Sequence, residues 1–390
     1  MNNTRDGAIV VHGGGPSAVL NASLVGIIDA CRDSPRIRRL YGAPFGALGL
    51  LQDDWFDLSP LPAALLARIR RAPGSVLGSS RRAFAPEHLD RVRERLEQRG
   101  IGTIFMTGGN GSMKTARILH DGFTVIGVPK TVDNDLAGTH RCPGFGSAAR
   151  FYAQATRDIG EDNRALPSPV TIVEVIGRNA GWVVGATALA RARQDDPPHL
   201  IYLPERPPTL DQICRDVTEV HRRIGRVVVT VCEGLRDPDG NPFGADLDRA
   251  GNRQHELASN LGHTLARAVS AATGLRVRSE KPGLLGRSCS FAVSEADALD
   301  SYRCGFDAVR AAERGESGVM IALTPHGGTC TVPLEDVAGK ERLVPGDWIV
   351  PSGNGVEPAF LEYVAPLAGP IEPLPYLERL PNLEPLPPSR

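Results

Sequence analysis

The sequence lacks any apolar run long enough to cross a membrane, which takes about 18 residues. Its first residues, MNNTRDGAIVV, also lack the long apolar stretch of a secretory signal peptide. We therefore expect neither a membrane protein nor a secreted one. The sequence predicts a cytoplasmic protein.

The chain also lacks an excess of one charge and a pattern of paired cysteines. Acidic and basic side chains nearly cancel at a net charge of -1, so we expect neither nucleic acid nor a membrane surface as a partner. The seven cysteines are odd in number and form no CxxC pair. They argue against a disulfide framework and predict buried or free thiols.

Two common nucleotide-binding signatures are absent as well. No glycine-rich turn is followed by the GK[ST] of a Walker loop. The turns also lack the GxGxxG spacing and the acidic ribose partner of NAD-dependent dehydrogenases. Glycine-rich turns alone do not support a dehydrogenase, and we set that class aside.

The length and the apolar pattern indicate the fold. The 390 residues are too many for one simple core and fit two lobes. Apolar runs without strict alternation predict strands buried on both faces of a parallel sheet; they span residues 8–11, 104–107, 124–128, 170–176 and 227–231. Amphipathic stretches with helical spacing include residues 86–98 and 210–224. This alternation predicts an α/β fold with two Rossmann-like, doubly wound lobes and an active-site cleft between them.

Residues 127–146, GVPKTVDNDLAGTHRCPGFG, place two carboxylates, a lysine and a threonine after an apolar run. Asp133 and Asp135 are separated by one residue, and in an extended segment both carboxylates would point to one side. Such a pair suits phosphoryl transfer, in which one carboxylate takes a proton from the attacking hydroxyl and the other helps to place a metal ion. Lys130 would then face the charge of the donor. The alternative is a loop capped by Asn and Asp, without catalysis.

Two glycine-rich turns follow predicted strands. The first, HGGGPSAVLNASLVG, leads into a helix expected to begin near Ser17, and the second, MTGGNGSMKT, opens another helix. Backbone N–H groups at such turns bind anions, so the pair could hold a di- or triphosphate. The second turn would add the Ser112 hydroxyl. The alternative is a pair of tight turns in which Asn110 and Ser112 only cap a helix.

The motifs GGGPSAVLNASL, LGSSR, TGGNGSMKT, GVPKTVDNDL, PGFGSAAR, IVEVIGRNAGW, LIYLPE and VCEGL occur in the order found in phosphofructokinases. The resemblance covers nearly the whole chain and is closest to the pyrophosphate-dependent branch. It implies a kinase that moves a terminal phosphoryl group to the 1-hydroxyl of fructose 6-phosphate or a related sugar phosphate.

The resemblance also implies roles for individual residues. Asp133 would be the base, Thr131 would contact the same end of the substrate, and Lys130 would bind the donor phosphate. Asp135 and Asn110 would hold Mg²⁺. The implied donor contacts are Gly14, Gly15, Arg81, Gly109, Asn110, Gly111 and Ser112. The implied contacts to the substrate are Thr131, Asp133, Asp135, Ile176, Gly177, Arg178, Glu233, Arg278 and Arg287, with Arg178 also catalytic. Glu233 could instead be a buried, paired carboxylate.

The organisation implied is a donor-binding lobe of residues 1–147 with about 288–345, and a sugar-phosphate-binding lobe of residues 148–287 with about 346–365. Proline-rich residues 366–390 would lie extended on the surface. Polar residues 237–252 suggest a mobile loop or the edge of a lid. In the family, Arg278 and Arg287 match residues that grip the 6-phosphate, one of them across a subunit interface. A homodimer or homotetramer is therefore expected.

Three departures from the family pattern bear on donor and acceptor. Gly111 replaces an aspartate that in pyrophosphate users fills the space of an ATP α-phosphate; this favours ATP, whereas Lys130 favours pyrophosphate. Asn110 would be a weaker metal ligand than a carboxylate. Pro169, Leu284 and Gly286 replace polar residues of the acceptor site. Pyrophosphate, a different sugar or polyol acceptor, and a catalytically silent regulatory paralogue remain as alternatives.

Overall fold

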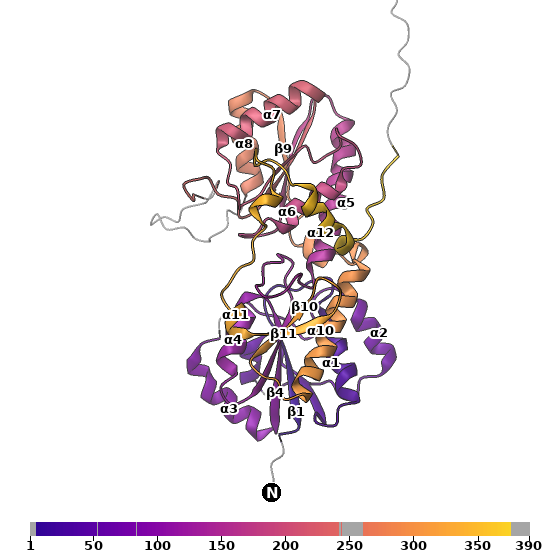
Figure 1. Ribbon diagram of the computed structural model, residues 1–390, viewed down its shortest axis with the longest axis vertical. Helices are drawn as coiled ribbons and strands as arrows, with labels where there is room; N and C mark the ends of the chain where they lie inside the picture. The colour runs from indigo at the N-terminus through magenta and orange to yellow at the C-terminus, as the bar shows by residue number, and fades with distance from the viewer. Residues whose placement is uncertain (1–4, 53, 83, 242, 244–259, 376–390) are drawn as a thin grey trace, which may run out of the picture.

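Two β-sheets organise the chain, one in the lower and one in the upper part of Figure 1. The computed structural model describes residues 5–52, 54–82, 84–241, 243 and 260–375. The lower sheet has seven strands in the order β11-β10-β5-β4-β1-β2-β3, and the upper has four in the order β7-β8-β6-β9. These sheets confirm the predicted α/β fold with two lobes.

The seven-stranded sheet is parallel at its centre. At its two edges, β3 pairs antiparallel with β2, and β11 pairs antiparallel with β10. Its strands are β1 (Gly7–His12), β2 (Arg39–Gly42), β3 (Phe56–Asp57), β4 (Ile101–Gly108), β5 (Thr124–Pro129), β10 (Val319–Leu323) and β11 (Thr329–Pro333). Side chains of β1 alternate between two cores. Such burial on both faces explains why the strand sequences show no polar alternation.

Helices cover both faces of this sheet. One face packs against α1 (Leu20–Arg32), α2 (Ala63–Arg71) and α10 (Glu295–Glu313). The other face packs against α3 (Leu89–Gln98), α4 (Asn110–Leu119) and α11 (Leu334–Val337). This is the doubly wound arrangement that the sequence predicted.

The four-stranded sheet is parallel throughout. Its strands are β6 (Val170–Val175), β7 (Leu200–Tyr202), β8 (Val227–Cys232) and β9 (Val277–Glu280). Helices α5 (Phe145–Arg164), α6 (Trp182–Ala186) and α12 (Pro358–Ala368) pack on one face, and α7 (Leu210–Ile224) and α8 (Leu261–Thr273) on the other. The short helix α9 (Leu285–Ser288) follows β9.

Three connections join the elements of the two sheets in the described part of the chain. Residues 130–144 lead from β5 to α5, residues 289–294 lead from α9 to α10, and residues 338–345 lead from α11 toward α12. The last of these rises from the lower to the upper lobe in Figure 1. The first carries the predicted catalytic carboxylates, so this loop bridges the two sheets.

Most predicted element positions agree with the structure. All five predicted strands are present, and the predicted helix at 210–224 matches α7. Two boundaries were wrong. The first helix begins at Leu20 rather than near Ser17, and α12 continues to Ala368, past the expected start of an extended tail. Residues 369–375 of that tail contain no helix or strand. Residues 376–390 and most of the polar segment 237–252 lie outside the described residues.

The thiols also agree with the sequence. All seven cysteines are free, and five of them are buried. No helix in the described ranges has the length and apolar character that a bilayer crossing requires.

Candidate active site

Loops at the carboxyl ends of parallel strands from both sheets meet at one place. The N–H of Lys130, after β5, donates to the carbonyl of Gly108 at the end of β4, with an N···O distance of 3.1 Å. The charges of Arg178, after β6, and Glu233, after β8, both act on Asp133. Ligands of doubly wound sheets gather at such strand ends.

The first glycine-rich turn lies against three cationic side chains. The buried Lys130 donates from Nζ to the carbonyl of Gly15. A side-chain carbon at position 15 would lie 2.6 Å from Nη1 of Arg287 and 3.3 Å from Nη2 of Arg81. At position 14 it would lie 3.3 Å from Nζ of Lys130. Glycine here keeps the backbone within reach of three positive charges, a suitable environment for a polyphosphate.

The second turn opens α4, and Ser112 connects it to the first. Side-chain carbons at Gly13 and Gly108 would lie 2.1 and 2.0 Å from Oγ of Ser112. The Ser112 side chain is therefore packed between the two turns and largely buried. The N-cap of helix α4 is Gly109, so neither Asn110 nor Ser112 occupies the cap position of the alternative interpretation.

Asn110 ties the second turn to the connection at residues 338–345. Its Nδ2 donates to the carbonyl of Lys340 at 3.1 Å, and its Oδ1 accepts from the N–H of Gly339 at 3.2 Å. Both polar atoms of the predicted metal ligand thus have backbone partners. Gly111 differs, because a side-chain carbon there would meet no atom within 4 Å. Space is open beside Gly111.

The loop with the two aspartates is not extended, so the geometric premise drawn from their spacing was wrong. Asn134 has a φ of 56°, in the left-handed region, and its side chain is buried. It donates to the hydroxyl of Tyr363 at 2.8 Å and accepts from the N–H of Cys142 at 2.9 Å. Asn tolerates this conformation better than most residues, which explains why it lies between Asp133 and Asp135.

The two carboxylates nevertheless interact. Burial, together with the charges of Asp135 and Glu233, raises the pKa of Asp133 to about 7, although the charges of Arg178 and Lys130 oppose this rise. Burial lowers the pKa of Lys130 to about 8. A carboxyl group that titrates near neutral pH has the proton affinity that a general base needs.

Asp135 provides an orphaned oxygen. Its Oδ1 is buried and has no hydrogen-bond partner among the described residues. Burial raises the pKa of Asp135, and a hydrogen bond from Thr131 opposes that rise. The charge of Asp135 acts on Lys130. An unpaired carboxylate oxygen in this place fits a Mg²⁺ ion, which usually takes one or two protein carboxylates and completes its shell with phosphates and water. No group of three His, Cys, Asp or Glu side chains suited to a metal occurs in the described part of the chain.

The upper sheet contributes a second polar group. Glu233 accepts from the N–H of Gly177 at 3.4 Å, next to Ile176 and the exposed Arg178. Burial raises the pKa of Glu233, and the nearby Glu174 adds to this effect. Glu174 itself is buried and pairs with Lys281 Nζ at 2.6 Å, a residue that the sequence analysis did not single out.

The two arginines expected at the 6-phosphate have different surroundings in the structure. Arg278 is exposed on the edge strand β9, and none of the described contacts brings it to Asp133 or Glu233. Arg287 on α9 lies against Gly15, and its charge acts on Lys130. Arg287 therefore lies beside the first glycine-rich turn, and the charges of Asp133 and Glu233 also act on it.

Packing explains one departure from the family pattern. A side-chain carbon at Gly286 would lie 2.3 Å from Cε2 of the fully buried Tyr152. The Tyr152 hydroxyl in turn accepts from the N–H of Ile176 at 3.3 Å. The ring thus fills the space that a glutamine at position 286 would use.

Sequence reasoning missed Arg342 in the connection at 338–345. Its N–H donates to the carbonyl of Asp135 at 2.7 Å, and its guanidinium lies 4.2 Å from the ring centre of Trp182. Glu341 lies within 3.3 Å of Nδ2 of Asn179. No local motif marks this segment, because its contacts are with residues far away in the sequence.

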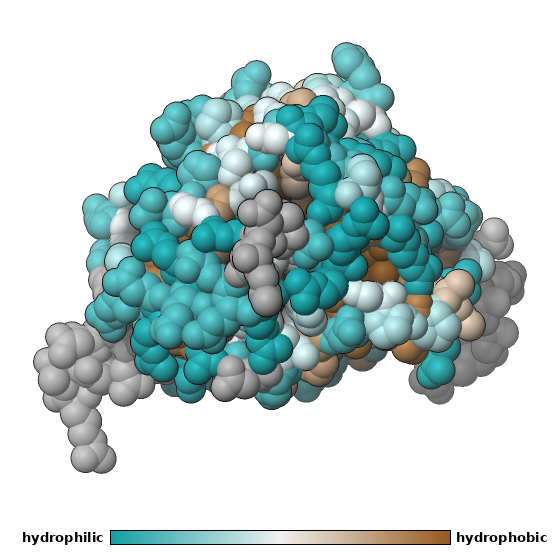
Figure 2. Space-filling model, turned by 90° about the horizontal axis from the view of Figure 1, so that it is seen from below, coloured by the Kyte–Doolittle hydropathy of each residue, from teal (hydrophilic) through white to brown (hydrophobic). Residues whose placement is uncertain are grey.

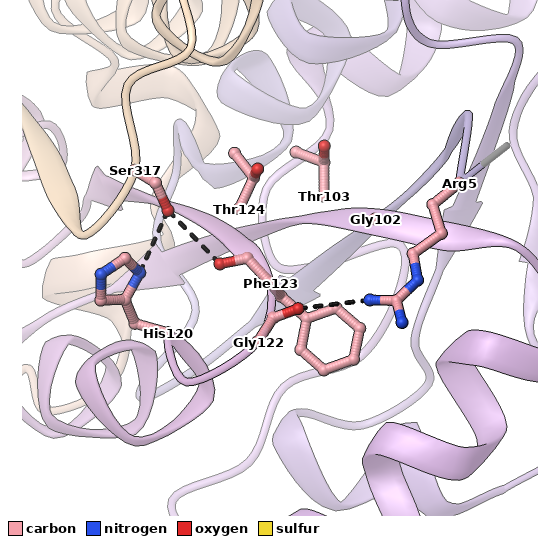
Figure 3. A pocket seen from close by; sticks show the side chains of 8 residues that line it. All are labelled: Arg5, Gly102, Thr103, His120, Gly122, Phe123, Thr124 and Ser317. Carbon is pink, nitrogen blue, oxygen red and sulfur yellow. Dashed lines mark hydrogen bonds between the residues drawn. The ribbon is translucent and has the colours of Figure 1, made fainter.

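A separate hollow lies at the amino ends of the strands. It has a volume of about 510 Å³ and is lined by Arg5, Gly102, Thr103, His120, Gly122, Phe123, Thr124 and Ser317 (Figure 3). Ser317 Oγ is 3.0 Å from His120 Nδ1, and Arg5 donates to the carbonyl of Gly122 at 3.3 Å. The molecular face seen from this lower end is mainly hydrophilic (Figure 2). The hollow is thus at the opposite strand ends from Asp133.

Glycine-rich turns, a titratable carboxylate and a cluster of cations on a doubly wound fold are features of a phosphotransferase. The chain belongs to the phosphofructokinase family, which matches residues 7–312, and is an enzyme of the 6-phosphofructokinase kind. It is 38% identical over 379 residues to the pyrophosphate–fructose 6-phosphate 1-phosphotransferase of Rhodospirillum rubrum, covering 93% of this chain and 94% of that protein.

Two further similarities extend the comparison. A sulfofructose kinase of Alkalicoccus urumqiensis is 32% identical over 361 residues, covering 86% of this chain and 90% of the relative. The crystal structure of a pyrophosphate-dependent phosphofructokinase from Nitrosospira multiformis superimposes with a TM-score of 0.86 at 29% identity, covering 96% of this chain and 95% of that one. The family resemblance inferred from the motifs is confirmed.

Proposed function

We propose that this enzyme transfers the terminal phosphoryl group of ATP to the 1-hydroxyl of fructose 6-phosphate or a related sugar phosphate. Asp133 is the base that takes the hydroxyl proton. The observation that carries this proposal is the position of Asp133 among Asp135, Glu233 and Arg178, with burial raising its pKa to about 7. Lys130 and Arg178 hold the negative charge that the reaction moves between oxygens.

The open space at Gly111 supports ATP as the donor. No atom lies within 4 Å of a side-chain carbon at this position, so an α-phosphate has room beyond the second turn. The second candidate donor is pyrophosphate, which the name of the Rhodospirillum relative favours. Lys130 and Arg81 beside Gly15 would bind either donor, whereas Arg287, on which the charges of Asp133 and Glu233 act, would bind the phosphate of the acceptor.

Asp135 is the proposed Mg²⁺ ligand, through its unpaired Oδ1. Asn110 would contribute only by exchanging its present backbone partners at residues 339 and 340. A bound Mg²⁺ would neutralise phosphate charge during transfer. Asp133 would accept the proton from the sugar hydroxyl. Thr131 would hold the loop of Asp133 beside the same end of the substrate, and Lys130 would bind the donor phosphate.

The acceptor is proposed to lie on the upper-lobe side, near Glu233 and Arg178. Glu233 would accept hydrogen bonds from sugar hydroxyls, and Ile176 and Gly177 would shape the floor beside it. The exposed Arg278 would reach a 6-phosphate in a neighbouring subunit of a homodimer or homotetramer. The sulfofructose kinase relative makes other anionic ketoses worth testing as acceptors.

We extend this assignment to the lobes. Residues 1–147 with about 288–345 would bind the donor, and residues 148–287 with about 346–365 would bind the sugar. The arrangement is supported by the two turns of the lower sheet, which face Lys130, and by Glu233 on the upper sheet.

The deciding experiment is a matrix of two donors and several acceptors on the purified protein with Mg²⁺. ATP and pyrophosphate are each combined with fructose 6-phosphate, sedoheptulose 7-phosphate, sulfofructose and myo-inositol, and phosphorylated product is measured by mass spectrometry. Turnover with ATP and a ketose phosphate is the expected result. If only pyrophosphate supports turnover, pyrophosphate and not ATP is the donor. If no combination of donor and acceptor gives product, the protein is better explained as a catalytically silent paralogue.

A further inference from the structure

The loop that carries Asp133 is held from behind by a carboxylate of another element. Asp297, in the first turn of α10, is 5% exposed. Its Oδ1 accepts from the N–H of Gly144 at 2.8 Å. Its Oδ2 accepts from the N–H of Ser147 at 2.9 Å and from Ser147 Oγ at 2.6 Å. One buried carboxylate thus collects three donors at the start of α5.

Gly144, which is hydrogen-bonded to Asp297, also contacts the loop that carries Asp133. It forms a parallel bridge with Thr131, whose N–H donates to the carbonyl of Pro143 at 3.2 Å. The Thr131 hydroxyl accepts from the N–H of Asp133 at 3.1 Å. A continuous series of contacts therefore runs from Asp297 through Gly144 and Thr131 to Asp133.

A second carboxylate of α10, Asp300, also binds the segment that precedes α5. Asp300 accepts two hydrogen bonds from Arg141, of 2.6 and 3.0 Å, and both side chains are nearly buried. Arg141 also donates to the carbonyl of Thr324 at 2.8 Å. Residues 141–147 are thus fixed to α10 at two points, and α10 itself packs on the lower sheet.

We infer that Asp297 is a positioning residue for phosphoryl transfer, which sets the place of the Asp133 carboxylate by holding Gly144 and Ser147 through its ionised side chain. This inference rests on the proposed function, because it assumes that Asp133 is the base. A catalytic group displaced by about 1 Å loses up to about 10²-fold in rate. The role is one of geometry, since Asp297 does not touch the substrate site.

The charge of Asp297 gives the inference a pH signature. Burial raises the pKa of Asp297 to about 6, while the hydrogen bonds from Ser147 and Gly144 lower it. Asp297 lines a small cavity with two other charged side chains, Asp300 on its own helix and Arg141 on the loop before α5. The Cys142 thiol also lines this cavity, and α12 contributes only the apolar Leu367. Burial raises the pKa of Cys142 to about 12, so this thiol does not titrate near pH 6.

The test uses Asp297→Asn, because an amide resembles the protonated carboxyl. In both groups one of the two polar atoms carries hydrogen and would face the N–H groups of Gly144 or Ser147, which also donate. At about pH 8 we expect kcat to fall about 10- to 100-fold, with KM for both substrates changed by less than about twofold. As the pH falls to about 5, the ratio of wild-type to variant kcat should approach one, because wild-type Asp297 is then protonated too.

Asp216→Asn is the matched control for lost stability. Asp216 in α7 also accepts two side-chain hydrogen bonds, 2.8 Å from Tyr202 and 2.9 Å from Asn354, away from the site. It should lower the melting temperature and leave kcat unchanged at both pH values. If Asp297→Asn does not fold, Ser147→Ala replaces it in the test, because it removes the hydroxyl that donates to Asp297. This variant should lower kcat about threefold at an unchanged KM.

The experiment distinguishes a failure of the proposed function from a failure of the positioning role of Asp297. If the wild-type protein transfers no phosphoryl group, the proposed function fails. If the wild-type protein is active but folded Asp297→Asn keeps its kcat, or loses it by the same factor at both pH values, the positioning role of Asp297 is wrong. An unchanged kcat in Ser147→Ala would overturn it where Asp297→Asn cannot be made.

Discussion

Replacing Asp133 by asparagine should make the protein less active and more stable at once. Asparagine keeps the size of the side chain but cannot take a proton. A positioned base contributes about 10²- to 10⁴-fold to the rate, so kcat should fall by at least about 10²-fold while donor binding is kept. A residue with only a structural role would show the opposite effect on stability, because its loss would destabilise the fold.

The stability change follows from the pKa of Asp133, which is raised from 3.8 to about 7 in the folded protein. Because the folded pKa lies above the unfolded value, ionisation of Asp133 costs stability. The cost is absent below about pH 4, grows between about pH 4 and 7, and is complete above about pH 7. Three pKa units correspond to about 4 kcal/mol, and partial solvent access reduces this to on the order of 2 to 4 kcal/mol.

The assay is urea unfolding of wild-type protein and Asp133→Asn at several pH values, with kcat measured on the same samples. The variant should be more stable at about pH 8 and equal to wild type at about pH 4. A variant that is less stable at about pH 8, or that keeps wild-type turnover, would contradict the assignment of Asp133 as a partly buried base whose ionisation destabilises the fold.

Three further predictions concern the surroundings of Asp133. Lys130→Met should raise the KM for the donor about 10- to 100-fold with a smaller effect on the sugar, since it removes a charge-assisted contact beside Gly15; equal effects on both substrates, measured by initial rates, would contradict this placement. Gly111→Asp should shift the ATP-to-pyrophosphate ratio of kcat/KM toward pyrophosphate by about tenfold, because a carboxylate there repels the α-phosphate. The same ratio in both proteins would show that Gly111 does not select the donor. Gly286→Ala should lower the free energy of unfolding by about 1 to 3 kcal/mol through overlap with Tyr152, whereas Gly346→Ala, which meets no atom within 4 Å, is the control and should change it little.

The sequence predicted the fold well because the signals for it are local. Continuous apolar strands such as residues 124–128 and the amphipathic repeat of residues 210–224 depend only on their own side chains. The glycine-rich turns and the motif at residues 130–135 were found for the same reason. These features place the predicted catalytic loop at the ends of the correct strands.

The contacts that orient the site were not predictable, because they join residues far apart in the chain. The left-handed turn at Asn134 is held by Tyr363, more than two hundred positions away. The contact of Arg287 with Gly15 of the first turn also joins residues far apart in the chain. The space filled by Tyr152 beside Gly286 and the hold of Asp297 on Gly144 likewise depend on packing between separate helices.

The central claim is that Asp133 activates a sugar hydroxyl for attack on a bound donor. The most direct measurement is product formation from fructose 6-phosphate and ATP with Mg²⁺, followed by phosphorus NMR in wild-type protein and in Asp133→Asn. We expect a new phosphate monoester at carbon 1 with wild-type protein and almost none with the variant. Equal formation of this product by both proteins would contradict it.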